Sequence, residues 1–205
     1  MLGGTFNPPH IGHVALARSA RDQLGLDRVV LMPASIPPHK AAERDPGASR
    51  RLAMCRLAIE RESGISACAL ELDRPGPSYT VDTLDAIHAI QPDAELTFIV
   101  GADIARTLPS WREPANVLRA ARLAVAERSG TSREQVLRTV AELQAPTAAQ
   151  TSGVVFLKMP AVEVSSSMVR ERAARGEPLE ALVGADVAGY ISENGLYRAD
   201  GGGRA

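Results

Sequence analysis

The sequence predicts a doubly wound α/β fold, in which helices cover both faces of a parallel β-sheet. Short apolar runs alternate with segments of helical periodicity, and the runs are continuous, as strands buried on both faces require. The chain has 205 residues, 45% of them hydrophobic and 23% charged, and at about 150 residues per domain this length accommodates one full domain. We expect a single domain over residues 1–198, with a small C-terminal helical part at about 164–198 and a disordered tail at 199–205.

Strands and helices alternate through the first half of the chain, where proline-rich and glycine-rich segments separate them. Pro37 and Pro38 exclude a regular helix from a long charged loop. The next helix is expected to begin with Ser49 as its N-cap and to carry a solvated face, formed by Arg50, Arg51, Arg56 and Arg61. The expected elements are a helix over 13–24, a strand over 29–33, the loop over 34–48, the helix from Ser49, a strand over 65–72 and a helix through 81–88.

The second half of the chain continues the alternation and ends in helices. Its expected elements are a strand over 96–100 ending in Gly101, helices over 104–108 and 115–121, a strand over 123–126, a helix over 131–143, a strand over 154–157, and helical pieces around 168–174, 179–183 and 187–192. In such sheets ligands bind outside the carboxyl ends of the strands, at the point where the strand order reverses. The strand-to-helix turns are therefore where a functional site is expected.

Composition and charge exclude several classes of protein. Lysine plus arginine number 23 against 24 aspartate plus glutamate, a formal net charge of -1, so no global field attracts nucleic acid. No apolar run approaches the ~20 residues of a membrane span, and the first residues lack the pattern of a signal peptide. Cys55 and Cys68 have no CxxC partner and are expected to be buried thiols in a reducing compartment. We expect a cytoplasmic protein without nucleic-acid or membrane partners.

The first strand-to-helix turn has a composition that suits phosphate binding, since residues 3–13 read GGTFNPPHIGH. The paired glycines let the backbone approach a ligand closely, and the N-terminus of the following helix offers unpaired N–H groups to an anion. His10 and His13 lie three residues apart on one helical face, where Gly12 would leave room for a phosphate to reach both imidazoles. By themselves, two histidines at this spacing also fit a surface pair or half of a metal site.

A second anion site is expected at the start of the helix around 168–174. Ser165, Ser166 and Ser167 stand at its N-terminus, and Arg170 follows on the same face. Hydroxyls, helix N–H groups and a guanidinium would then converge on one phosphate. The alternative is an ordinary serine N-cap followed by a solvated arginine.

The turn at 3–13 resembles the G-x-F-x-P-x-H-x-G-H signature of the nucleotidylyltransferase superfamily. Further segments, in the same order along the chain, resemble the bacterial nicotinate-nucleotide adenylyltransferases within it. These segments are PPHK at 37–40, RPGPSYTVDT at 74–83, FIVGAD at 98–103, Trp111 and VSSSMVR at 164–170. The resemblance covers the chain from Leu2 to about Tyr197, and it implies a Rossmann-like fold.

The resemblance implies transfer of AMP from ATP to the 5'-phosphate of nicotinate mononucleotide, which yields deamido-NAD and pyrophosphate in NAD biosynthesis. The attacking phosphate is already an anion at neutral pH, so direct in-line attack on the α-phosphate needs alignment and charge stabilisation rather than a general base. Mg2+ is implied as a cofactor that ATP carries, and no protein ligand to the metal is expected. The implied partners are the two small-molecule substrates, and a homo-oligomer is left open.

Residue roles follow from the resemblance by position. An acidic pyridine ring calls for an aromatic face and for hydrogen-bond donors to its carboxylate. The implied catalytic residues are His10, His13 and Arg170; those for ATP are Gly3, Gly4, Thr5, Phe6, Lys40, Gly101, Asp103, Arg128, Ser165, Ser166 and Ser167; those for nicotinate mononucleotide are His39, Tyr79, Thr80 and Trp111. Two positions depart from the family pattern, because Asn7 replaces a usual Asp and Ser129 replaces a usual proline beside Arg128.

Three alternatives stay open at the level of sequence. A sister adenylyl- or cytidylyltransferase acting on phosphopantetheine or glycerol phosphate shares the signature that the turn at 3–13 resembles. Class I aminoacyl-tRNA synthetases share the His-Ile-Gly-His tetrad, although this chain is short and lacks a basic face for tRNA. A non-catalytic nucleotide-binding regulator would keep the fold without turnover.

Overall fold

A computed structural model describes residues 1–38, 44–127, 132–144, 153–159 and 162–198. The described strands form one six-stranded sheet in the order β3-β2-β1-β4-β5-β6, and every strand pair in it is parallel. The strands are β1 (Leu2–Gly4), β2 (Val29–Pro33), β3 (Ile65–Ala67), β4 (Thr97–Gly101), β5 (Arg122–Ala126) and β6 (Val154–Leu157). The strand order reverses between β1 and β4, which confirms the doubly wound prediction.

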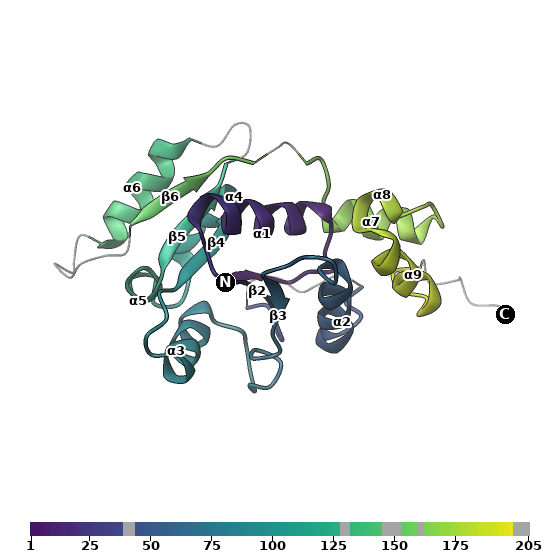
Figure 1. Cartoon of the computed structure of the whole chain (residues 1–205), viewed down its shortest axis with the longest axis horizontal. Helices are drawn as coiled ribbons and strands as arrows, with labels where there is room; N and C mark the ends of the chain where they lie inside the picture. Colours follow the sequence, from purple (N-terminus) through teal and green to yellow (C-terminus); the bar gives the residue numbers. More distant parts are fainter. Residues whose placement is uncertain (39–43, 128–131, 145–152, 160–161, 199–205) are drawn as a thin grey trace.

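Helices cover both faces of this sheet (Figure 1). Helices α1 (Ile11–Leu24) and α2 (Ala48–Ala58) pack on one face, and α3 (Thr80–Ile90), α5 (Pro114–Ala120) and α6 (Arg133–Gln144) pack on the other. Strand β4 shows why the sequence supports two layers, because Ile99 joins the α1–α2 core whereas Phe98 and Val100 join the α3–α5–α6 core. Alternate side chains of a strand point to opposite faces, so an apolar run fills both.

Three further helices gather at one end of the molecule beside α2 (Figure 1). They are α7 (Ser166–Ala174), α8 (Glu180–Val183) and α9 (Ala185–Glu193), and they share a separate apolar cluster with Met54 of α2. This is the expected small C-terminal helical region. Short elements α4 (Ala102–Ala105) and η1 (Leu108–Ser110) follow β4. Within the described part of the chain, no helix combines the length and the apolar character needed to cross a membrane.

Several sequence expectations are wrong in detail. The strand expected over 65–72 ends at Ala67, because the chain turns at Ala69 and the N–H of Leu72 bonds back to it. The N-cap of α2 is Gly47, whose φ of 96° suits glycine, rather than Ser49. Cys55 is buried as expected, but Cys68 is only half-buried. The expected tail at 199–205 lies outside the described residues.

Arg51 is the largest departure from the expected solvated face of α2, because its side chain is completely buried. Its Nη1 donates to the backbone oxygens of Thr5 and Ala34 at 2.8 and 2.6 Å, and its Nη2 donates to Ser35 O at 3.1 Å. Its Nε pairs with Asp45 Oδ1 at 2.9 Å. One guanidinium therefore joins the segments that follow β1 and β2, since its fixed fork of donors satisfies carbonyls from both.

A second buried network surrounds Glu71, which is 6% exposed. Thr83 Oγ1 donates to Glu71 Oε1 at 2.8 Å, and Arg74 Nη2 donates to Thr83 Oγ1 at 3.0 Å. Burial raises the pKa of the Glu71 carboxyl, although hydrogen bonds from Thr83 and Ser78 and the charge of Arg74 oppose the rise. Ser78 also accepts from Ser35 N–H at 2.8 Å, so the network joins the start of α3 to the segment after β2.

Replacing Arg51 by methionine should cost about 3–5 kcal/mol of unfolding free energy, because three carbonyl oxygens and the Asp45 carboxylate lose their donor. Urea unfolding followed by circular dichroism measures this change. The matched control is Arg50→Met on the exposed side of the same helix, expected within about 0.5 kcal/mol of the parent. Equal stability of the two variants would contradict the role given to the buried guanidinium.

Glu71→Gln should become more stable relative to the parent protein as pH rises. The carboxyl pKa is raised in the folded state, so the parent has its full contribution below the unfolded pKa and loses stability as pH rises through the folded pKa. Glutamine keeps an acceptor oxygen for Thr83 and cannot ionise. Urea unfolding of both proteins from pH 4 to pH 8 measures the difference, with exposed Glu95→Gln as the control for removal of one negative charge. A difference that is flat or falls with pH contradicts this account.

Candidate functional site

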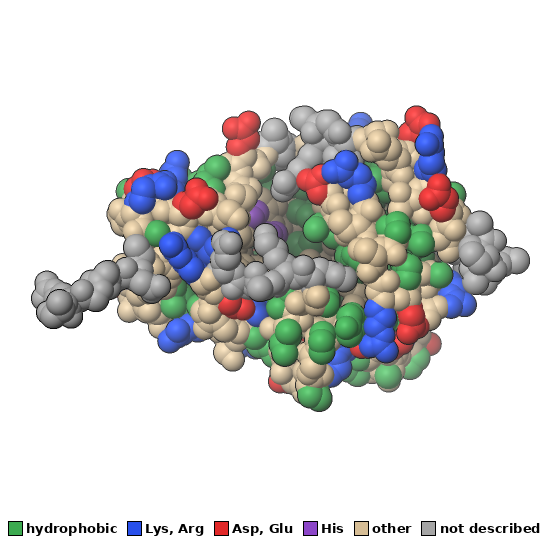
Figure 2. Space-filling model, turned by 180° about the vertical axis from the view of Figure 1, so that it is seen from behind, with side chains coloured by type: hydrophobic (Ala, Val, Ile, Leu, Met, Phe, Trp, Pro, Cys, Tyr) green, Lys and Arg blue, Asp and Glu red, His purple; other side chains and the backbone are tan. Residues whose placement is uncertain are grey.

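The histidine turn, residues 5–10, lies between β1 and α1 at the point where the strand order reverses. Leu2 of β1 pairs with Ile99 of β4, so the carboxyl ends of these two strands lie side by side. Figure 2 shows histidine side chains at the base of a hollow in one face of the molecule. The expected position of the site, at the carboxyl edge of the sheet, agrees with this arrangement.

His10 and His13 form a stacked pair, with ring centroids 3.7 Å apart and ring planes inclined by 26°. His10 is the N-cap of α1 and is 5% exposed, whereas His13 is half-buried with the Phe6 ring edge-on to it at 4.9 Å. The backbone N–H of His10 donates to His13 Nδ1 at 3.1 Å. This bond leaves the proton of a neutral His13 ring on Nε2, which makes Nε2 a hydrogen-bond donor.

Gly12 has a different role from the one expected. A Cβ at this position would lie 3.1 Å from His10 Nδ1 and 3.2 Å from Val164 Cγ1. The space above Gly12 is therefore occupied by the His10 ring and by the segment before α7, and it is not open for a phosphate. The glycine allows α1 to approach both groups closely.

The start of α7 binds the histidine turn through side chains. Ser166 Oγ donates to Pro8 O at 2.8 Å, and Arg170 Nη1 donates to Asn7 O at 2.9 Å. Ser165 Oγ accepts from Met168 N–H as an N-cap, and Arg170 Nη2 donates to Ser167 Oγ at 3.2 Å. All three serine hydroxyls thus have partners within the protein, and the cap interpretation holds for Ser165.

The N-termini of α1 and α7 meet at this place, which creates a region of positive potential. Neither helix has an acidic residue in its first turn, and helix N-termini favour anions. A nearby cavity of about 460 Å³ is lined by Arg44, Ser167, Arg170 and Glu171. Sequence reasoning missed Arg44, although it lies in the loop that the charge pattern had singled out. The arrangement suits a polyphosphate better than a neutral ligand.

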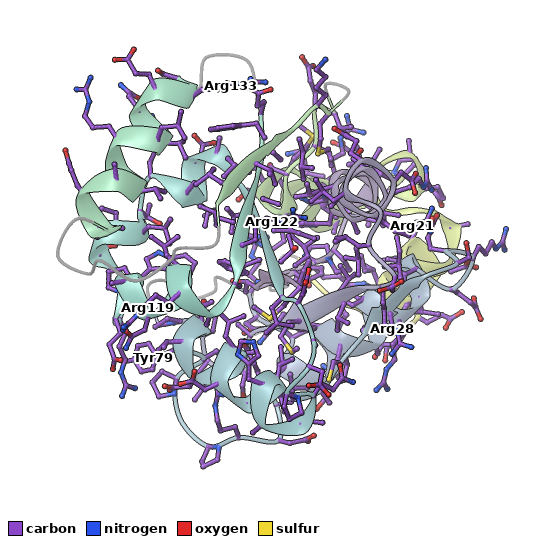
Figure 3. The ribbon with its side chains drawn as sticks, turned by 60° about the vertical axis from the view of Figure 1, so that its left-hand side comes forward. Arg21, Arg28, Tyr79, Arg119, Arg122 and Arg133 are labelled. Atoms are coloured by element: carbon purple, nitrogen blue, oxygen red, sulfur yellow. The ribbon has the colours of Figure 1, made fainter. Side chains whose placement is uncertain are left out.

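Two of the residues expected to hold the pyridine ring lie on the α3–α5 side of the sheet. Tyr79 and Trp111 both pack against the core there. The guanidinium of Arg112 lies over the Tyr79 ring, 4.9 Å from its centroid, and Trp111 Nε1 donates to Thr107 Oγ1 at 2.9 Å. Figure 3 shows Tyr79 at the edge of the molecule, on the same side as Arg119 of α5. Sequence reasoning missed Arg112, which lies over Tyr79 and is paired with Asp82 and Glu113.

The remaining residues expected at the site lie in different places in the structure, and some lie outside its described part. Thr5 contributes its carbonyl to Arg51, and Gly101 ends β4, the strand that pairs with β1. Asp103 lies in the first turn of α4, whose N-cap is Gly101, and is exposed and paired with Arg106 at 2.9 Å. The residues expected at the site but lying outside the described part of the chain are His39, Lys40 and Arg128. Among the described residues, no group of three or more His, Cys, Asp or Glu side chains is placed to hold a metal ion.

Residues 1–172 match the cytidylyltransferase-like family. A curated relative from Dehalococcoides mccartyi, described as a probable nicotinate-nucleotide adenylyltransferase, is 40% identical over 198 residues, which is 96% of this chain and 95% of the relative. Another of the same description, from Halalkalibacterium halodurans, is 39% identical over 201 residues, covering 98% of this chain and 91% of the relative. The relatives therefore match this chain along nearly its whole length.

Among solved structures, the chain is similar to a Plasmodium falciparum nicotinic acid mononucleotide adenylyltransferase complexed with NaAD. The TM-score is 0.76 at 18% identity, over 96% of this chain and 95% of that one. At this identity the likeness shows the fold. Taken with the family match and the nearly full-length relatives, the chain belongs to the cytidylyltransferase-like family and, within it, to the nicotinate-nucleotide adenylyltransferases.

Proposed function

We propose that this protein transfers AMP from ATP to nicotinate mononucleotide, producing nicotinate adenine dinucleotide and pyrophosphate. The observation that carries the proposal is the 40% identity, over 96% of the chain, to a curated relative described by that activity. The site supports it chemically, because stacked histidines, an arginine and two helix N-termini lie together at the switch point of the sheet.

The chemistry requires alignment and charge stabilisation. The mononucleotide phosphate attacks the α-phosphorus of ATP in line, a new P–O bond forms, and the bond to the β-phosphate oxygen breaks as pyrophosphate leaves. His13 Nε2–H donates to an oxygen of the transferred phosphoryl group, and Arg170 neutralises charge on the polyphosphate. The attacking oxygen carries no proton at neutral pH, so the two histidines act as donors and no base is needed.

Mg2+ enters this reaction with ATP as part of the substrate. Two arginines, Arg44 and Arg170, line the cavity at the start of α7, with Glu171 at its wall. Such a site fits a metal held by phosphate oxygens and water, as Mg2+ commonly is. When bound, the ion neutralises phosphate charge.

The acceptor base would lie against Trp111 and Tyr79. An aromatic face stacks on the pyridine ring, while the N–H and hydroxyl groups of Thr80, at the start of α3, donate to its carboxylate. Arg112 lies over the Tyr79 ring, and its guanidinium is paired with Asp82 Oδ2 at 3.3 Å and with Glu113 Oε1 at 3.7 Å. A carboxylate gains from these donors in a way that a neutral amide does not, so the proposal includes preference for the acidic nucleotide.

Pyrophosphate release with ATP and Mg2+ should be fastest with nicotinate mononucleotide, compared with nicotinamide mononucleotide, glycerol 3-phosphate and phosphopantetheine. His13→Ala should lower kcat about 10²–10³-fold, because it removes a donor to the transferred group. His88→Ala, on α3 away from the turn, is the matched control and should retain activity.

Each other outcome of this assay has a defined meaning. Turnover with a different acceptor would keep the mechanism and overturn the pyridine assignment. ATP binding without turnover on any acceptor would indicate a nucleotide-binding regulator instead.

A further inference from the structure

Tyr197 lies where the segment after α9 reaches the histidine turn. Its hydroxyl donates to Asn7 Oδ1 at 2.8 Å, across 190 positions of sequence. Asn7 is 4% exposed and Tyr197 is 5% exposed. A buried hydrogen bond of this kind is costly to break, because each polar group would lose its partner without regaining water.

The backbone around this bond adopts a conformation that needs support. Phe6, directly before Asn7, has φ 51°, and Tyr197 has φ 61°. Both values lie in the left-handed region, which residues with a Cβ adopt reluctantly and which persists only where the surroundings enforce it. One of these residues directly precedes the acceptor Asn7, and the other is the donor Tyr197 itself.

Asn7 is held at both its backbone and its side chain. Arg170 Nη1 binds its carbonyl oxygen, and Tyr197 binds its amide oxygen. Three residues later, the backbone N–H of His10 donates to His13 Nδ1 at 3.1 Å, which fixes the orientation of the His13 ring. Burial raises the pKa of the Tyr197 hydroxyl, so it remains a proton donor at every pH at which the enzyme would be assayed.

We propose that Tyr197 is a positioning residue for adenylyl transfer, holding the histidine turn through Asn7 in the conformation that presents His13 to the transferred phosphoryl group. Tyr197 does not touch substrate in this account, and it acts through Asn7. The kinetic part of the inference rests on the proposed function, whereas the effect on His13 does not.

The kinetic test uses Tyr197→Phe, which keeps the ring in its apolar cluster and removes only the hydroxyl. The expected result is a fall in kcat of about tenfold, with the KM of each substrate within about twofold of the parent. A displaced His13 impairs the alignment of the transferred phosphoryl group more than it impairs substrate binding. Tyr190→Phe is the matched control, since Tyr190 packs against the same cluster of α7–α9. It should retain kcat.

A double-mutant cycle distinguishes positioning through Asn7 from general damage. Asn7→Ala should lower kcat by a similar factor. The kcat of the double variant, Asn7→Ala with Tyr197→Phe, should lie within about twofold of the kcat of the less active single variant. Additive losses would overturn the inference, because the two residues would then act separately.

A readout that needs no catalysis completes the test. The chain has four histidines, so the imidazole nitrogen resonances of His13 can be assigned in the ligand-free protein. Tyr197→Phe should shift them and Tyr190→Phe should not. If the parent protein fails to transfer AMP, the proposed function fails and this comparison still decides the positioning role. Unchanged His13 resonances in Tyr197→Phe overturn the inference, whatever happens to kcat.

Discussion

The histidine turn depends on side chains from elsewhere in the chain to satisfy its backbone. Thr5 O is bound by Arg51 of α2, Pro8 O by Ser166 and Asn7 O by Arg170 of α7. A turn between a short strand and a helix cannot pair these carbonyls within regular structure, and buried polar groups require partners. The conformation of the turn is therefore set by helices on both sides of it.

This constraint ties the C-terminal helical region to the histidine turn. The region packs its own apolar cluster against Met54 of α2, and the same helix carries Arg51 at the turn. Catalysis that relies on fixed donors loses little to reorganisation, because the dipoles already point where charge develops. A turn held by several hydrogen bonds is suited to that chemistry, whereas a mobile turn would have to be ordered at each turnover.

Periodicity predicted the alternation of strands and helices, and the motifs at 3–13 and 164–170 singled out two segments that the structure brings into contact. Local patterns could not reveal long-range pairing. Arg51 has the spacing of a solvated residue, and only the folded chain brings the carbonyls of Thr5 and Ala34 to it. The bond between Tyr197 and Asn7 was invisible for the same reason. Gly12 was predicted to leave room for a phosphate, yet a Cβ there would meet His10 and Val164, and local spacing could not reveal the approach of Val164.

The central claim is that the turn is already formed before substrate binds. Crystal structures of the protein alone and with a non-hydrolysable ATP analogue test this most directly. The account predicts that the Cα atoms of residues 4–13 superimpose within about 1 Å between the two structures, with His13 Nε2 at hydrogen-bond distance from an α-phosphate oxygen. A turn that refolds on binding, or an α-phosphate bound away from His13, would contradict it.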